Sequence, residues 1–126
     1  MGQKRKECPS AADINKLLSS MLVPEYILKD FEIWDVTSDS SSWTLELREK
    51  TGRLPKELES YPDVVFDGYC NPIDILCMAF VGKPVYLRVY RRRYKRSNSN
   101  THYNNDYEFT IKGIKMTPEM SFFLKG

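Results

Sequence analysis

The sequence has no apolar run of the roughly 18 to 20 residues that a membrane-spanning helix needs. It also has few of the residues that build covalent frameworks or active sites, with three cysteines and one histidine in 126 residues. An odd cysteine count argues against a disulfide framework, and a lone histidine offers no Ser/His/Asp or Cys/His arrangement. No glycine-rich phosphate loop is present. These absences predict a soluble, cytoplasmic protein that is not an enzyme and uses no cofactor.

Two sequence patterns resemble metal sites only weakly and are better explained by structural roles. Cys70 and Cys77 with His102 fall short of a zinc site, because the gap between the cysteines is too long and a fourth ligand is missing. We expect both cysteines to be small buried apolar residues and His102 to lie in a polar loop, as an accessory phosphate contact at most. Three acids near glycine and proline breaks are more typical of turns than of a divalent cation site: Asp63, Asp67 and Asp74. The sequence therefore predicts no metal.

Charge is distributed unevenly along the chain although the net charge is only +2. Between Asp30 and Asp67 there are ten acidic residues against four basic ones. From Ile75 to Asn105 there is no acid, and there are seven cations. Because a balanced total can hide a strongly basic surface, partners that carry negative charge stay open.

Periodicity predicts one α+β domain over residues 1–126, with a small antiparallel sheet of about four to five strands in hairpins between an N-terminal and a C-terminal helix. Residues 1–9 are expected to be disordered. Thr117 should cap the C-terminal helix and Pro118 should be its first residue. The expected elements are helices at 14–21, 24–31 and 117–124, a helical turn at 55–60, and strands at 31–36, 42–49, 84–94 and 107–112. The type of the apolar run after Pro72 is ambiguous.

The stretch "PVYLRVYRRRYKR", Pro84 to Arg96, is the clearest strand. Alternation places Val85, Leu87 and Val89 on a core-facing side. The other side carries alternating rings and guanidinium groups. Arg91 and Arg93 fall on the core side of the pattern, so the strand should leave the hydrophobic layer near Tyr90 and project as an arm. Residues 107–112 are its expected hairpin partner, and 95–106 the mobile hairpin loop.

This basic, tyrosine-interleaved strand predicts a nucleic-acid surface. Guanidinium groups suit phosphate oxygens, and tyrosine rings suit sugars or bases. An ordinary exposed edge whose charges pair with acids elsewhere is the structural alternative. The binding hypothesis is favoured because six cations within nine residues have no acid beside them in the sequence. The expected contact residues are Lys83, Tyr86, Arg88, Tyr90, Arg91, Arg92, Arg93, Tyr94, Lys95 and Arg96.

A protein-interaction role is the alternative function. In that role the basic hairpin would dock on an acidic surface, either of a catalytic subunit or of a second copy of the chain, and the acidic segment Asp30–Asp67 makes a homodimer electrostatically plausible.

Four segments, in order, resemble the N-terminal region family of bacterial insertion-sequence transposases of the ISL-three and ISAon-one type. They are "LVPEYILKDFEI", "ELREKTGRLPKEL", "GKPVYLRVYRRRYKR" and "YEFTIKGIKMTPEMSFFLKG", and the resemblance extends from Leu22 to the C-terminus. It implies a small module, often encoded beside the catalytic frame, that engages transposon ends. The matching positions in the basic strand are Gly82, Lys83, Val85, Tyr86, Leu87, Arg91, Arg92, Arg93 and Tyr94.

The chain departs from that family in two places. "CMAFVG" replaces the family's Asp-Phe-Pro-Ile-Arg-Gly run, with the loss of one arginine and the proline. The cysteine pairs that form a zinc ribbon in related full-length transposases have no counterpart after Arg93. No carboxylate triad is supplied either, so catalysis would come from a separate transposase subunit.

Overall fold

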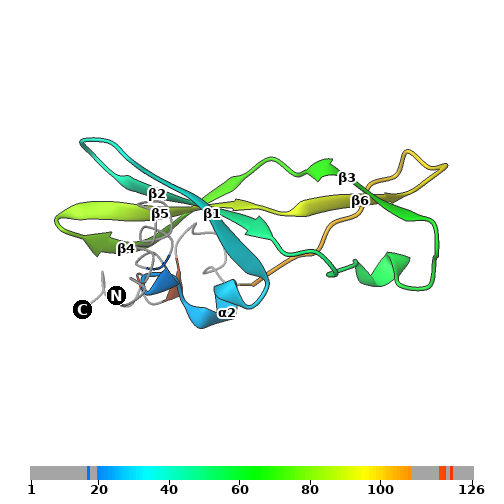
Figure 1. Ribbon diagram of the computed structural model, residues 1–126, viewed down its shortest axis with the longest axis horizontal. Coiled ribbons are helices and arrows are strands. Elements are labelled where there is room, and N and C mark those ends of the chain that lie inside the picture. Colours follow the sequence, from blue (N-terminus) through cyan, green and yellow to red (C-terminus); the bar gives the residue numbers. More distant parts are fainter. Residues whose placement is uncertain (1–16, 18–19, 109–116, 119, 121–126) are drawn as a thin grey trace, which may run out of the picture.

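The computed structural model describes residues 17, 20–108, 117–118 and 120. Over these residues the molecule is elongated and mostly β-sheet, with a four-stranded sheet at one end and a two-stranded sheet at the other (Figure 1). Within the described part of the chain, no helix has the length and apolar character needed to traverse a lipid bilayer.

The larger sheet is mixed, with strand order β1-β2-β5-β4. β1 (Phe31–Ser38) and β2 (Trp43–Glu49) form an antiparallel hairpin, and β4 (Ile73–Phe80) and β5 (Lys83–Tyr90) form another. The two hairpins join through β2 and β5, which run parallel, with Leu45 opposite Leu87. β5 therefore has a hydrogen-bonded neighbour on each edge.

The core lies on one face of this sheet. Alternate residues of the two inner strands point into it, and Leu45, Leu47, Val85, Leu87 and Val89 are each at most 1% exposed. The short helix α2 (Glu25–Leu28) covers this face through Ile27, which is fully buried in the same cluster. The opposite side of β5 carries Tyr86, Arg88 and Tyr90.

The smaller sheet pairs β3 (Val64–Tyr69) with β6 (Arg92–Arg96) in antiparallel register. Only Arg91 separates β5 from β6, so one nearly continuous strand passes through both sheets (Figure 1). We call the β3/β6 sheet, together with the 3-10 turn η1 (Lys56–Leu58) and residues 97–106, the arm. Tyr94 and Tyr103 bridge the arm through two backbone hydrogen bonds of 2.8 Å.

Several elements were predicted correctly. The hairpin at 31–49, the helical turn at 55–60, and the exit of the basic strand from the core at Tyr90 all agree with the structure. Thr117 caps a helical turn, because its Oγ1 accepts a hydrogen bond from the Met120 amide at 3.3 Å. Pro24 is the N-cap of α2 and not its first helical residue.

Two predictions about the sheet were wrong. The sheet is mixed, and residues 107–112 cannot be the hairpin partner of β5, because β2 and β4 already occupy both of its edges. Tyr107 and Glu108 lie outside any strand, and 109–112 fall outside the described residues. The two predicted terminal helices also lie largely outside them, as do residues 1–9.

The turn between β4 and β5 contains a strained residue. Val81 and Gly82 have φ of 51° and 75°, which makes a two-residue turn of the type that favours Asn-Gly. A β-branched residue is unfavourable at positive φ, and Val81 is 77% exposed, so little packing compensates for the strain.

Val81→Asn is therefore expected to raise the free energy of unfolding by about 1 kcal/mol, which shifts the melting temperature by roughly 3 to 5 °C. Thermal unfolding followed by circular dichroism measures the change. Val81→Thr is the matched control, since it keeps the β-branch and should not stabilise the protein. A melting temperature that rises equally in both variants would contradict this account of the turn.

Candidate nucleic-acid interface

The predicted alternation along β5 is correct. Tyr86 and Tyr90 are half-buried on the face away from the core, and the Arg88 side chain between them is 44% exposed. β6 continues the same series with Arg92, Tyr94 and Arg96. Guanidinium and aromatic groups thus follow one strand across both sheets.

At the junction of the sheets, Arg48 of β2 lies among three rings. Its guanidinium carbon is 4.8 Å from the ring centre of Trp34, 4.7 Å from that of Tyr69 and 4.8 Å from that of Tyr90. These rings come from β1, β3 and β5, so this cation–π cluster ties the arm to the larger sheet.

Arg92 repeats the arrangement one step along the arm. Its guanidinium carbon lies 3.8 Å from the Phe66 ring centre, and its Nε donates a 2.9 Å hydrogen bond to the Tyr94 hydroxyl. No carboxylate lies within ion-pair distance of Arg92 among the residues that the structure describes. Its charge is therefore the least compensated of the arginines on this face.

The other arginines are ion-paired, and the expectation that they lack nearby acids was wrong. Arg88 makes two hydrogen bonds to Asp74, at 2.9 and 3.1 Å. Three further pairs have N···O distances of 3.0, 3.8 and 3.2 Å: Arg91 with Asp106, Arg93 with Asp67, and Arg96 with Asp63. The partners flank the acid-free stretch in sequence, and β3, β4 and the segment after β6 bring them back to it. Asp63, Asp67 and Asp74 thus each face a different arginine.

Three predicted contact residues have structural positions. Tyr94 is buried, at 5% exposed. Arg91 braces the loop at 104–106, because its Nη1 donates to Asn104 Oδ1 and Asp106 Oδ1, each at 3.0 Å. Lys83 lies at the far end of β5, with its Nζ 4.2 Å from the Trp43 ring centre and bonded to the Asp39 carbonyl. The remaining predicted residues are half-buried or exposed and are here called the β5–β6 surface: Tyr86, Arg88, Tyr90, Arg92, Arg93, Lys95 and Arg96.

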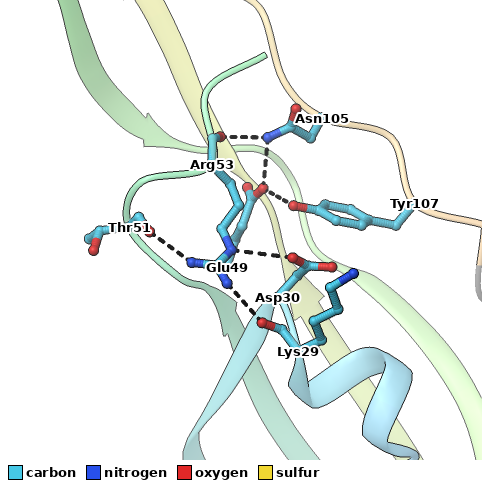
Figure 2. Close-up of polar contacts among 7 residues, drawn as sticks. All are labelled: Lys29, Asp30, Glu49, Thr51, Arg53, Asn105 and Tyr107. Atoms are coloured by element: carbon cyan, nitrogen blue, oxygen red, sulfur yellow. Dashed lines mark hydrogen bonds and ion pairs between the residues drawn. The ribbon is translucent and has the colours of Figure 1, made fainter. Parts of the chain in front are cut away.

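The predicted list omitted Glu49, which fixes where β6 begins. Its carboxylate is 1% exposed and accepts hydrogen bonds from the Arg92 amide at 2.7 Å and Asn105 Nδ2 at 3.0 Å. The Tyr107 hydroxyl donates a third (Figure 2). The sequence carried a signal for this residue, since Glu49 continues the buried alternation of Trp43, Leu45 and Leu47. An acid on a core-facing position indicates a buried, hydrogen-bonded carboxylate.

Arg53 anchors the chain as it leaves β2. Figure 2 shows its guanidinium reaching back to the end of α2, where Nε pairs with Asp30 Oδ1 at 3.2 Å and Nη2 donates to the Lys29 carbonyl at 2.9 Å. The Arg53 carbonyl accepts a 2.6 Å hydrogen bond from Asn105. The segment leading to η1 is thus fixed to both α2 and the loop that also binds Glu49.

His102 contacts β3 and is not isolated in its loop. Its Nε2 lies 2.5 Å from Asp67 Oδ2. The hydrogen bond from His102 is the main cause that holds the pKa of Asp67 below its ordinary value, with the charges of Lys95 and Arg93 adding to it. Burial acts to raise the pKa of Asp63, but the hydrogen bond and charge of Arg96, the backbone hydrogen bond of Asp63 and the Ser97 hydroxyl together hold it below its ordinary value. The carboxylates of Asp67 in β3 and of Asp63 just before β3 therefore stay charged at neutral pH.

Comparison with protein families, with curated proteins and with solved structures finds no match for this chain. The resemblance to transposase N-terminal regions accordingly stays a prediction.

Replacing Glu49 by Gln should lower the free energy of unfolding by about 3 kcal/mol, because one of its two accepting oxygens becomes an amide nitrogen facing donors. Urea unfolding measures the loss. Glu46→Gln, three positions earlier in the same strand, is the control. Glu46 is 25% exposed and 3.4 Å from Arg48, so its loss should cost no more than about 1 kcal/mol. Equal effects would rule out a special role for Glu49.

His102→Ala should raise the pKa of Asp67 toward its ordinary value of 3.8 and leave that of Asp63 unchanged. A lowered carboxyl pKa adds stability above the unfolded value, and this is lost as the pH falls through the folded value. The contribution of Asp67 should therefore be complete above about pH 4 and disappear in more acidic solution. Carboxyl carbon NMR across a pH titration measures both groups, and an unmoved Asp67 would contradict the assignment.

Proposed function

We propose that the protein is a non-catalytic, cytoplasmic DNA-binding module of a transposase, and that it contacts DNA through the β5–β6 surface. The observation that carries this proposal is the row of planar groups along one nearly continuous strand. Arg88 lies there between the half-buried rings of Tyr86 and Tyr90, and Arg92 and Arg96 continue the series along β6 on either side of the buried Tyr94. Such a row offers hydrogen-bond donors for phosphates and flat surfaces for sugars or bases.

The ion pairs of this surface are compatible with phosphate binding. Arg88 and Asp74 are 44% and 47% exposed, and Arg96 and Asp63 are 45% and 32% exposed. Exposed pairs contribute at most about 1 kcal/mol, so a phosphate can replace the carboxylate at low cost. The carboxylates also keep the arginines extended in the absence of DNA. Arg92 and Lys95 add charge that no described carboxylate neutralises at ion-pair distance.

In this proposal the N-terminal and C-terminal helices cover the core face of the four-stranded sheet. Thr117 supports that assignment, since its amide donates to the Leu76 carbonyl and its Oγ1 donates to the Cys77 carbonyl, both on β4. An α+β domain with a helix from each terminus on one face would leave the opposite face, with Tyr86 and Tyr90, to DNA.

Fluorescence anisotropy of a labelled duplex over a salt series tests the proposal. Five cations on the β5–β6 surface predict a log-log slope of about −4 to −5, from roughly 0.9 per phosphate contacted. Arg88→Gln should weaken binding about fivefold and reduce the slope by roughly 1. Asp74→Asn removes the same ion pair from its acidic side and should tighten binding about twofold to fivefold.

The two variants separate charge from structure. If Arg88→Gln and Asp74→Asn both weaken binding, the ion pair matters for folding and not for contact with DNA. Glu25→Gln in α2 controls for the added charge of Asp74→Asn, because it changes the net charge equally at a distant exposed position. No binding of duplex at low salt would reject the proposed function.

A protein-interaction role is a second candidate, favoured by the internal charge compensation. Four of the arginines pair with aspartates of the same chain, which leaves a nearly balanced surface rich in Arg and Tyr. Such a composition is typical of protein interface cores. The partner would be a catalytic transposase subunit or a second copy of the chain.

A further inference from the structure

A cavity of about 370 Å³ is lined by residues of the arm. The arm forms the end of the molecule away from the four-stranded sheet (Figure 1). η1 and the turn after it contribute Glu57, Leu58 and Tyr61 to its lining. The end of β6 and the following loop contribute Arg96, Asn98 and Tyr103. Its size falls in the range of small-molecule sites, and its lining combines rings with both signs of charge.

Arg96 is held in a fixed orientation at this cavity. Its guanidinium carbon lies 4.0 Å from the Tyr61 ring centre, and its Nε donates to Asp63 Oδ1 at 3.2 Å. Within the described residues its two terminal nitrogens make no hydrogen bond. They are thus available to an anionic group, and a guanidinium with two free nitrogens suits a phosphate.

The two acids of the lining differ in their partners. Asp63 is engaged by Arg96 and by the Ser97 hydroxyl at 3.3 Å. Glu57 forms neither a hydrogen bond nor an ion pair with any residue that the structure describes. An ionised carboxylate is acceptor-only, with two oxygens side by side, so its best partner presents two adjacent N–H donors. Among the nucleobases, only guanine does so, through N1–H and the N2 amino group.

The rings and the amide complete a site for a base. Tyr61 and Tyr103 offer aromatic surface, and the buried Leu58 lies behind them. Unstacked bases bind proteins through stacking on such rings and hydrogen bonds to their edges. The Asn98 amide supplies both a donor and an acceptor for the remaining polar atoms of the base.

We propose that this cavity binds an unstacked guanine nucleotide, with the base edge on Glu57 and the phosphate on Arg96. The inference rests on the proposed function. Arg96 is the last residue of the β5–β6 surface, so a nucleic-acid strand bound along this surface would reach the cavity. It adds what that surface lacks. Arginines that bind phosphate give affinity without sequence preference, whereas a carboxylate that selects guanine gives a sequence preference at one position.

Nitrogen-15 NMR of the full chain titrated with 5′-GMP tests the site directly. The amides of Leu58, Asn98, Ser99 and Tyr103 should shift, with an affinity at least about fivefold higher than for 5′-AMP or 5′-CMP. Glu57→Gln should remove that preference while the protein stays folded, because Glu57 is exposed and has no partner among the described residues. Glu59→Gln, an exposed acid two positions on that does not line the cavity, is the matched control and should keep the preference.

Equal shifts with all three nucleotides, shifts reproduced by inorganic phosphate alone, or no shift at these amides would each overturn the guanine site. The anisotropy experiment on duplex DNA is independent of these shifts. Guanine-specific shifts without duplex binding would keep the cavity assignment and reject the DNA-binding role of the β5–β6 surface. Duplex binding without such shifts would keep that role and reject the cavity assignment.

Discussion

The buried carboxylate of Glu49 is the contact on which the arrangement of the two sheets depends. A carboxylate at 1% exposure is costly, and no described cation pairs with it, so three donors from two segments of the chain must offset the cost. One of these is the amide of Arg92, the first residue of β6. The others belong to the loop that returns from the arm. Satisfying this one side chain therefore fixes where the arm leaves the core and where the chain comes back.

Two arginines of this protein, Arg48 and Arg92, act as planar packing groups. Arg48 lies among Trp34, Tyr69 and Tyr90 and so joins β3 to the larger sheet, with which β3 shares no hydrogen-bonded edge. Arg92 covers Phe66 and adds a side-chain contact between β6 and its hydrogen-bonded neighbour β3. Lysine would not replace them, because an ammonium group has no flat face to stack on a ring. Acidic and basic residues are separated along the sequence, but folding brings them together. Aspartates from β3 and β4 contact arginines from β5 and β6.

Local pattern was sufficient for the parts of the fold that depend on neighbours in the sequence. Alternation in "SWTLELRE" and "PVYLRVY" identified the core faces, and the arginines at 91 and 93 indicated where the strand leaves the core. The partners of that strand could not be found in the same way. The parallel pairing of β2 with β5 joins segments about forty residues apart, and only the packing of the whole sheet selects it. The ion pairs were missed for the same reason, since no local pattern relates Asp63 to Arg96 or Asp74 to Arg88.

The passage of one strand through both sheets has a mechanical consequence. A load applied to the arm along β6 passes through Arg91 directly into β5, without a flexible linker to absorb it. β5 is bonded along its length to β2 and β4, so the load is resisted by two rows of hydrogen bonds in shear. Pulling the arm away from the larger sheet would thus require many backbone hydrogen bonds of β5 to break together. A flexible linker between β5 and β6 would instead let the arm move without breaking any of them. The arm is built to transmit force to the core and not to swing independently of it.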